Sequence, residues 1–214
     1  MQLIKLNNIT VVQNGVVLLE NINLTIEKGS WINITDISSH QYLILLKLLE
    51  GRLAPTIGEY IFDGAQVKEF SKLQRASLRK REALNLAEDS FLNMEKTVIE
   101  NIRLQLKASG IYPTKFKAII NNILNELALS HIKGNKCSNL KSNEIIQVKL
   151  AKAIASSPKL IMLNTDLIRD INVKEEVNIN NIIKNSIIEK DISILTSNYN
   201  YMEKSSLIKN IKLV

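Results

Sequence analysis

The chain has 214 residues, of which 45% are hydrophobic and 23% are charged, and this balance fits a soluble globular protein with one sizeable core. Its single cysteine excludes an internal disulfide framework, and lysine or asparagine interrupts the apolar runs well before the roughly 18 residues that a membrane span needs. The formal net charge of +7 is scattered and only 5% of the residues are aromatic, so no nucleic-acid partner is expected.

The first third of the chain is predicted to be mostly β-strand. Apolar and polar residues alternate from Ile22 to Ile26, which is typical of a half-buried strand. Asn14-Gly15 is a strong signal for a tight hairpin turn. Strands are expected at Leu3–Val12, Val16–Leu19, Ile22–Ile26, Gly29–Thr35 and Gly58–Gly64.

The remainder is predicted to be mainly helical, with two buried strands near its end. Apolar residues between Phe116 and Leu127 follow helical spacing, and Ser156-Ser157-Pro158 is a stop signal. Helices are expected over Leu43–Gly51, Ser71–Arg81, Thr97–Ser130 with a break at Gly110–Pro113, and Ser142–Ala155. The buried strands are expected at Lys159–Leu163 and Ile192–Thr196. This order indicates an α/β nucleotide-binding architecture.

A strand, a turn and an apolar helix between residues 29 and 51 form the setting of a phosphate-binding loop. The pattern of that loop is Gly-x-x-x-x-Gly-Lys-Ser/Thr, in which backbone N–H groups and the lysine hold phosphates and the hydroxyl holds Mg²⁺. The turn lacks this chemistry, and no Gly-Lys-Ser/Thr occurs anywhere in the chain. On this segment alone, an unrelated strand-turn-helix remains open. The two glycines fall on Asp36 and Gln41, the lysine on Tyr42 and the hydroxyl on Leu43, with Ser38 and Ser39 inside the loop.

Four segments, in this order and spacing, resemble the ATP-binding subunits of ABC (ATP-binding cassette) systems. They are Leu18–Gly29, Leu46–Gly64, Thr97–Ile102 and Leu150–Leu163. The chain looks most similar to the cell-division (FtsE) and lipoprotein-release type. The resemblance implies an α/β, P-loop NTPase-like ABC ATPase fold over residues 1–214. Residues 1–88 and 156–214 would form the core with its antiparallel β subdomain, and residues 89–155 would form a helical subdomain.

The resemblance also assigns the positions that contact nucleotide in the family, and nearly all of them have changed. The Q-loop glutamine falls on Glu88, and the signature loop falls on Lys141, Ser142 and Asn143. The metal-binding aspartate, the glutamate that polarises water and the switch histidine fall on Asn164, Thr165 and Ser197. The aromatic residue that stacks on adenine has no counterpart. No catalytic or metal-binding residue of the family is therefore expected to be retained.

These assignments predict a degenerate subunit, a pseudo-ATPase that docks a permease-like membrane protein of the cell-division or lipoprotein-export type. Family members receive a helix of the permease beside the Q-loop, and Phe91, Leu92 and Met94 are apolar enough to do so here. The protein would then be cytoplasmic and peripheral on the inner face of the cell membrane.

An ATP-binding and ATP-hydrolysing subunit with an unorthodox site is the alternative function, and ATP and Mg²⁺ would be its cofactors. A homodimer and a pair with a second ABC subunit are both open. A nucleic-acid-binding module based on the basic Arg75–Arg81 cluster is a weaker idea, because such clusters are usually solvated helix faces.

Overall fold

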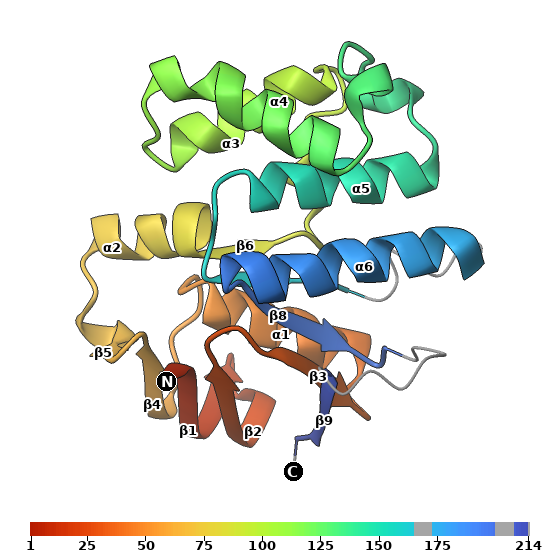
Figure 1. Ribbon diagram of the computed structural model, residues 1–214. Coiled ribbons are helices and arrows are strands. Elements are labelled where there is room, and N and C mark those ends of the chain that lie inside the picture. Colours follow the sequence, from red (N-terminus) through yellow and green to blue (C-terminus); the bar gives the residue numbers. More distant parts are fainter. Residues whose placement is uncertain (165–172, 200–207, 214) are drawn as a thin grey trace.

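Two β-sheets and a layer of helices organise the chain, as the computed structural model shows for residues 1–164, 173–199 and 208–213 (Figure 1). The first sheet is antiparallel, with the strand order β2-β1-β4-β5. The second is parallel, with the order β6-β7-β8-β3-β9. Among the described helices, none is long and apolar enough to cross a bilayer.

The antiparallel sheet follows the predicted hairpin. Asn14 and Gly15 both have positive φ, as a tight hairpin turn requires. The second strand differs from the prediction, because it is one strand of 12 residues and not two. Asn21 takes a positive φ of 49° and donates its N–H to the Thr10 hydroxyl, so the strand passes through an irregularity at its polar centre without ending. The strands are β1 (Gln2–Gln13), β2 (Val16–Glu27), β4 (Ile57–Phe62) and β5 (Ala65–Gln66).

The parallel sheet separates two apolar cores. Neighbouring residues of a strand face opposite sides, so Trp31 and Ile194 contribute to one core while Ile32 and Leu195 contribute to the other. Two short strands, β6 and β9, were not predicted. The strands are β3 (Trp31–Thr35), β6 (Ala83–Asn85), β7 (Leu160–Met162), β8 (Ser193–Ser197) and β9 (Ile208–Lys212).

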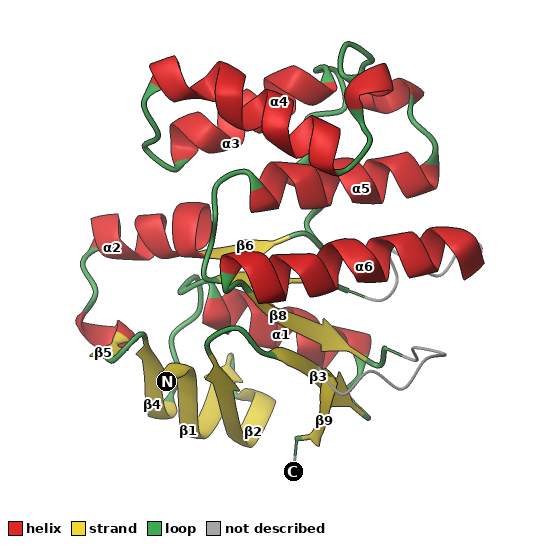
Figure 2. Cartoon of the chain, viewed as in Figure 1, coloured by secondary structure: helices red, strands yellow, loops and turns green. Residues whose placement is uncertain are grey.

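Helices cover both faces of the parallel sheet and form a separate layer above it (Figure 2). The layer contains α3 (Val98–Ala108), α4 (Phe116–Glu126) and α5 (Ser142–Ile154), all near their predicted positions. Beside the sheet lie α1 (Ser39–Leu49) and the unpredicted α6 (Val173–Lys190).

The predicted basic helix is present, but only its first part is α-helical. It consists of α2 (Lys72–Ser77) followed by one π-helical turn, Leu78–Glu82. The helix α1 instead begins four residues before its expected start, because Ser38 caps it: the Ser38 hydroxyl accepts the Gln41 N–H at 3.2 Å.

Candidate functional site

The turn between β3 and α1 is closed by its own side chains. Asp36, at the first glycine position, takes a φ of 57°, which aspartate tolerates better than most residues. Its carboxylate is exposed and pairs with Lys212 Nζ at 3.2 Å. The Asn198 side-chain amide donates to the Ile37 carbonyl at 2.7 Å. The turn is therefore held to the end of the parallel sheet by contacts within the chain.

The first turn of α1 uses its polar groups internally. Gln41 Oε1 accepts from the Ser38 N–H at 3.3 Å and from the Ser38 hydroxyl at 2.9 Å, which completes a capping box. Ser39 is exposed, and Leu43, at the magnesium-hydroxyl position, is 42% exposed and has no ligand atom. Ser38 and Gln41 thus serve as a helix cap.

Tyr42, at the lysine position, points into the protein. Its side chain is 1% exposed and belongs to the core between α1 and the parallel sheet. Its hydroxyl lies 2.8 Å from the Leu163 carbonyl oxygen and 3.2 Å from that of Leu195. Burial raises the pKa of this phenol, while its hydrogen bond with Ser197 acts in the opposite direction. Tyr42 is therefore a neutral donor that joins the carboxyl ends of β7 and β8.

The structure brings two further predicted positions to this edge of the sheet. Asn164 lies two residues beyond the end of β7 and is half-buried, and Ser197 ends β8 and is buried. Thr165 lies outside the described residues. Across residues 1–164, 173–199 and 208–213, no group of three His, Cys, Asp or Glu side chains could hold a metal ion.

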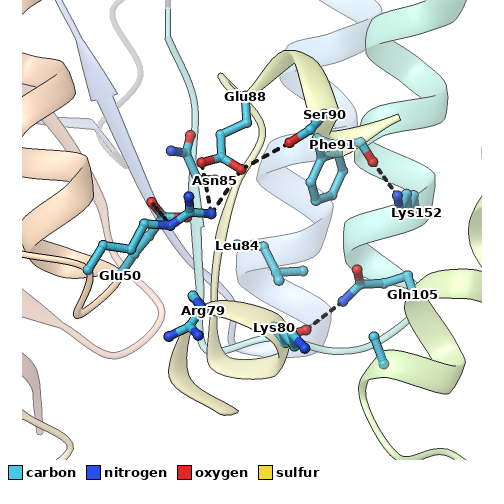
Figure 3. Close-up of a pocket in the computed structure, with 12 residues that line it drawn as sticks. Glu50, Arg79, Lys80, Leu84, Asn85, Glu88, Ser90, Phe91, Gln105 and Lys152 are labelled. Atoms are coloured by element: carbon cyan, nitrogen blue, oxygen red, sulfur yellow. Dashed lines mark hydrogen bonds and ion pairs between the residues drawn. The ribbon is translucent and has the colours of Figure 1, made fainter. Parts of the chain in front are cut away.

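Glu88, at the Q-loop position, lines a cavity of about 320 Å³ between the sheet and the helical layer (Figure 3). Arg52 joins two acids there, with Nη2 2.9 Å from Glu88 Oε1 and Nε 3.2 Å from Glu50 Oε2. The Ser90 hydroxyl donates to Glu88 at 3.3 Å. Glu50 is 2% exposed, and mainly its burial raises its pKa to about 7, against the opposing charge of Arg52.

Two buried lysines of α5 support the segment on either side of Glu88. Lys149 Nζ donates to the Leu86 carbonyl at 2.9 Å, and Lys152 Nζ donates to the Phe91 carbonyl and lies 4.7 Å from the Phe91 ring centroid. Burial lowers the pKa of Lys152 to about 8. Sequence reasoning missed both lysines, although their spacing of three among apolar residues was a usable signal.

The residues predicted to receive a permease do not all reach the surface. Phe91 is half-buried and Met94 is 38% exposed, but Leu92 is 3% exposed and packs in the core, so it is not available for docking. Leu92 turns inward, whereas Asn93 and Met94 beyond it are exposed.

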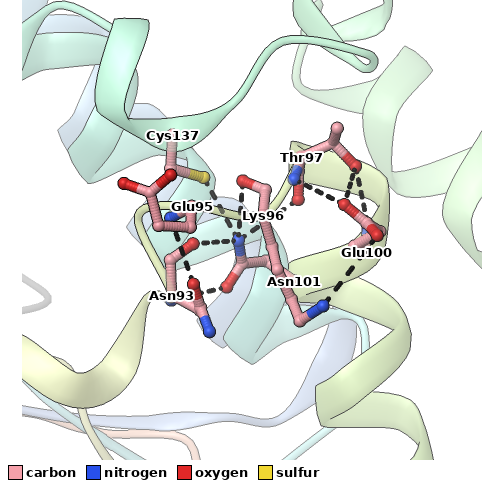
Figure 4. A network of polar contacts seen from close by, with 7 residues as sticks. All are labelled: Asn93, Glu95, Lys96, Thr97, Glu100, Asn101 and Cys137. Carbon is pink, nitrogen blue, oxygen red and sulfur yellow. Dashed lines mark hydrogen bonds and ion pairs between the residues drawn. The ribbon is translucent and has the colours of Figure 1, made fainter.

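Asn101, at the start of α3, fixes the loop after this segment (Figure 4). Its side-chain oxygen accepts the Asn93 N–H at 2.8 Å, and its side-chain nitrogen donates to the Asn93 carbonyl at 2.9 Å. The same nitrogen lies 3.3 Å from Cys137 Sγ. Thr97 and Glu100 cap α3 beside it.

The signature-position residues lie apart from the other predicted sites. Lys141 precedes α5, and its N–H donates to the Glu144 side chain at 2.8 Å. Ser142 is exposed and Asn143 is half-buried. Within the described part of the chain, no hydrogen bond or ion pair links these three residues to Asp36, Tyr42 or Glu88.

Comparison with known proteins decides the family. The family model described as ABC transporter matches residues 19–164, which is more than half of the chain. The chain belongs to the ABC transporter family. The methionine import ATP-binding protein MetN of Haemophilus influenzae (strain 86-028NP) is 28% identical over 164 residues, which are 75% of this chain and 47% of that protein. MetN of Haemophilus ducreyi (strain 35000HP / ATCC 700724) is 27% identical over 147 residues, 69% of this chain and 42% of the relative.

Solved ABC cassettes have the same fold. The chain matches cbiO1 from Clostridium perfringens, part of the ABC transporter complex cbiONQ, with a TM-score of 0.83 and 16% identity over 100% of this chain and 87% of that one. It matches the dimeric cassette MJ0796 bound to ADP and Pi with a TM-score of 0.77 and 19% identity over 92% and 88% of the two chains. These likenesses confirm the expected ABC ATPase fold. The chain spans less than half the length of the two MetN relatives.

Proposed function

We propose that this ABC family member is a pseudo-ATPase subunit that docks a permease-like membrane protein from the cytoplasmic side. The observation that carries the proposal is Tyr42. The family uses a lysine at this position to hold the outer phosphates, whereas Tyr42 is buried, neutral and bonded to the Leu163 and Leu195 carbonyls. A side chain in this orientation offers no charge to a nucleotide.

The surroundings of Tyr42 do not fit a triphosphate either. At a phosphate-binding loop, free backbone N–H groups and the positive end of the helix dipole receive the anion. Here the Ser38 hydroxyl already accepts the Gln41 N–H, and Asp36 adds a negative charge at the mouth of the turn. Both features weaken phosphate binding.

The Mg²⁺ site of the family has no matching donors among the described residues. Leu43 has no oxygen, and Asn164 offers at most a neutral amide oxygen where an aspartate is needed. Thr165, at the position of the water-polarising glutamate, cannot act as a base at neutral pH. ATP and Mg²⁺ therefore do not fit the donor set, and we derive no catalytic step through them.

The cavity beside Glu88 supports the docking part of the proposal. It lies between the sheet and the helical layer, and Phe91 forms part of its wall, while Met94 is exposed nearby in the sequence. An apolar face of a partner helix would cover these side chains, and the Arg52–Glu88 pair would form a polar border.

The type of partner is a finer proposal. Resemblance of the sequence favours a cell-division or lipoprotein-export complex, whereas the two relatives are named as methionine import proteins. An ATP-hydrolysing pair with a second ABC subunit, or a homodimer, is the competing assembly, since MJ0796 is described as a dimer. Lys141, Ser142 and Asn143 are poor replacements for the glycines and serine that such a pair contributes to the partner's nucleotide.

Nucleotide-dependent stability tests the proposal. The free energy of unfolding is measured in urea with and without Mg²⁺-ATP, and ATP turnover is assayed on the same preparation. A ligand at about 100 times its Kd would raise the free energy of unfolding by about 2.7 kcal/mol, and we expect no increase at millimolar ATP. A higher free energy of unfolding with ATP, together with Mg²⁺-dependent ATP hydrolysis, would show an active enzyme and contradict the proposal.

A further inference from the structure

Residues 68–82, here called the basic segment, hold much of the chain's excess positive charge. The segment contains six basic and two acidic residues, a net charge of +4 out of +7 for the whole chain. It covers the end of the 3₁₀ turn Val67–Glu69, the helix α2 and the π-helical turn. The basic residues are Lys68, Lys72, Arg75, Arg79, Lys80 and Arg81.

Most of this charge is not neutralised by the residues that the structure describes. Arg75 donates to the Phe70 and Lys68 carbonyls. The other five basic residues form no ion pair with any described residue, and four of them are exposed. Some lysines elsewhere in the chain are paired, as Lys159 is with Asp63 and Glu82. The five are Lys68, Lys72, Arg79, Lys80 and Arg81.

An apolar side chain projects from the same short helix. Leu73 is 83% exposed, the highest value, apart from Met1, among the large hydrophobic residues that the structure describes. Leu78, on the inward side, is 1% exposed, and a Cβ on Gly51 would meet it at 3.3 Å. The packing of Leu78 against Gly51 fixes the inner side of the segment and leaves Leu73 and the basic side chains outside.

The basic segment also borders the surface where we propose that the permease docks. Arg79 and Lys80 line the same cavity as Glu88 and Phe91 (Figure 3). Gln105 of α3 donates to the Lys80 carbonyl at 2.9 Å, which attaches the segment to the helical layer. A partner embedded in a membrane would bring lipid headgroups toward this side of the molecule.

We infer that the basic segment is a contact surface for the anionic headgroups of a membrane, with Leu73 entering the interface. Exposed lysine and arginine contribute about 1 kcal/mol each near an anionic surface, and an apolar residue among them adds burial. Single-stranded nucleic acid fits less well, because Phe70 is the segment's only aromatic residue and it is half-buried. The orientation toward a membrane rests on the proposed function, whereas binding to lipid does not.

Co-sedimentation with vesicles tests the inference on the full chain. We expect binding to phosphatidylcholine vesicles that contain phosphatidylglycerol, weakening as salt rises, and no binding to phosphatidylcholine alone. Lys72→Gln/Lys80→Gln/Arg81→Gln should weaken binding about 100-fold. Leu73→Gln should weaken it by about tenfold, because only part of a leucine enters the interface.

Matched variants keep the test specific. Lys115→Gln/Lys117→Gln/Lys133→Gln removes the same charge from exposed sites around α4, and Ile188→Gln replaces an apolar residue that is 69% exposed. Both should bind vesicles like the wild type.

Three results would overturn the inference. The first is equal binding to vesicles with and without phosphatidylglycerol. The second is an equal loss of vesicle affinity in the two triple variants. The third is tighter binding to duplex DNA than to vesicles through the same basic residues. The assay contains neither nucleotide nor permease. A negative vesicle result therefore leaves the pseudo-ATPase proposal standing, and ATP turnover would overturn that proposal without affecting the vesicle result.

Discussion

Two side chains of the α1 region place polar atoms in the core. Tyr42 lies near the start of α1 and Glu50 follows its last residue, and their polar atoms differ in how well their hydrogen bonds are satisfied. The Tyr42 hydroxyl is neutral and reaches two carbonyls, so its burial costs little. Glu50 is an acid whose Oε2 lies 3.2 Å from Arg52 Nε but accepts no hydrogen bond among the described residues. A single ion pair does not offset the cost of removing a carboxylate from water, so its pKa rises to about 7.

Stability should therefore decrease as Glu50 ionises. An unfolded glutamate has a pKa near 4.3, below the folded value of about 7, so the folded state holds the proton more tightly. Its contribution is fully present below the unfolded pKa and is lost as pH rises through the folded one. Between about pH 5 and about pH 8, the wild type should lose roughly 2–3 kcal/mol more than Glu50→Gln. Urea unfolding at each pH measures this.

Glu20→Gln is the control for that series, because Glu20 is an exposed acid on β2. Its unfolding free energy should follow that of the wild type at every pH. If Glu50→Gln also follows the wild type, Glu50 ionises normally in the folded protein, and the strength assigned to its burial is incorrect.

The sequence predicts the strands well where their pattern is long, and it predicts contacts between distant residues poorly. The β1–β2 hairpin follows from Asn14-Gly15 and from alternation, which are local signals. The strand β6 has only three residues and no pattern of its own. The link from Arg52 to Glu88 spans 36 residues and depends on how two elements pack, so no local signal announces it.

The same reasoning applies to the candidate site. Loss of the phosphate-loop residues can be predicted from the sequence, because the motif is a fixed local pattern. The inward orientation of Tyr42 cannot be predicted from the sequence. It depends on α1 starting at Ser39 and on the carbonyls of Leu163 and Leu195. Leu92 was misjudged because it turns inward in a segment without regular secondary structure, where no periodic pattern marks the buried position.

At the scale of elements, the attachment of the helical layer depends on a few buried polar contacts. The short segment between η3 (Asp89–Phe91) and α3 has no strand of its own, so side chains and a neighbouring loop satisfy its backbone. Asn101 binds the N–H and the carbonyl of Asn93 and is fully buried. The Ser138 N–H donates to the Met94 carbonyl at 2.9 Å. The position of the proposed docking residues therefore depends in part on one amide of α3.

Asn101→Ala should destabilise the protein by about 1–3 kcal/mol, because the Asn93 N–H loses its partner and the Asn93 carbonyl keeps only the Lys96 N–H. Amide hydrogens of residues 93–97 should also exchange faster with solvent, since the segment opens locally. Hydrogen exchange and urea unfolding measure the two effects. Asn121→Ala, at an exposed position of α4, should change neither. Unchanged exchange in residues 93–97 of Asn101→Ala would show that other contacts hold the segment.

At the scale of the whole molecule, the chain keeps the ABC fold, and we propose that the residues at its nucleotide-contacting positions have changed. The two cores on either side of the parallel sheet hold its strands and the helices beside it, and Tyr42 links β7 to β8. A subunit packed in this way can act as a fixed platform. The surface around the Glu88 cavity is where such a platform would meet its partner.

Met94→Glu should weaken binding of the proposed permease-like partner. Met94 is exposed, so the substitution costs the free subunit little, but it places a charge where we expect an apolar partner helix. Recovery of the permease with the tagged subunit from detergent-solubilised membranes should fall about tenfold or more, equivalent to about 1.4 kcal/mol. Tyr112→Glu introduces the same charge at a more exposed site beyond α3, and it should leave recovery unchanged. Equal recovery with both variants, at unchanged unfolding temperatures, would place the permease contact elsewhere on the subunit.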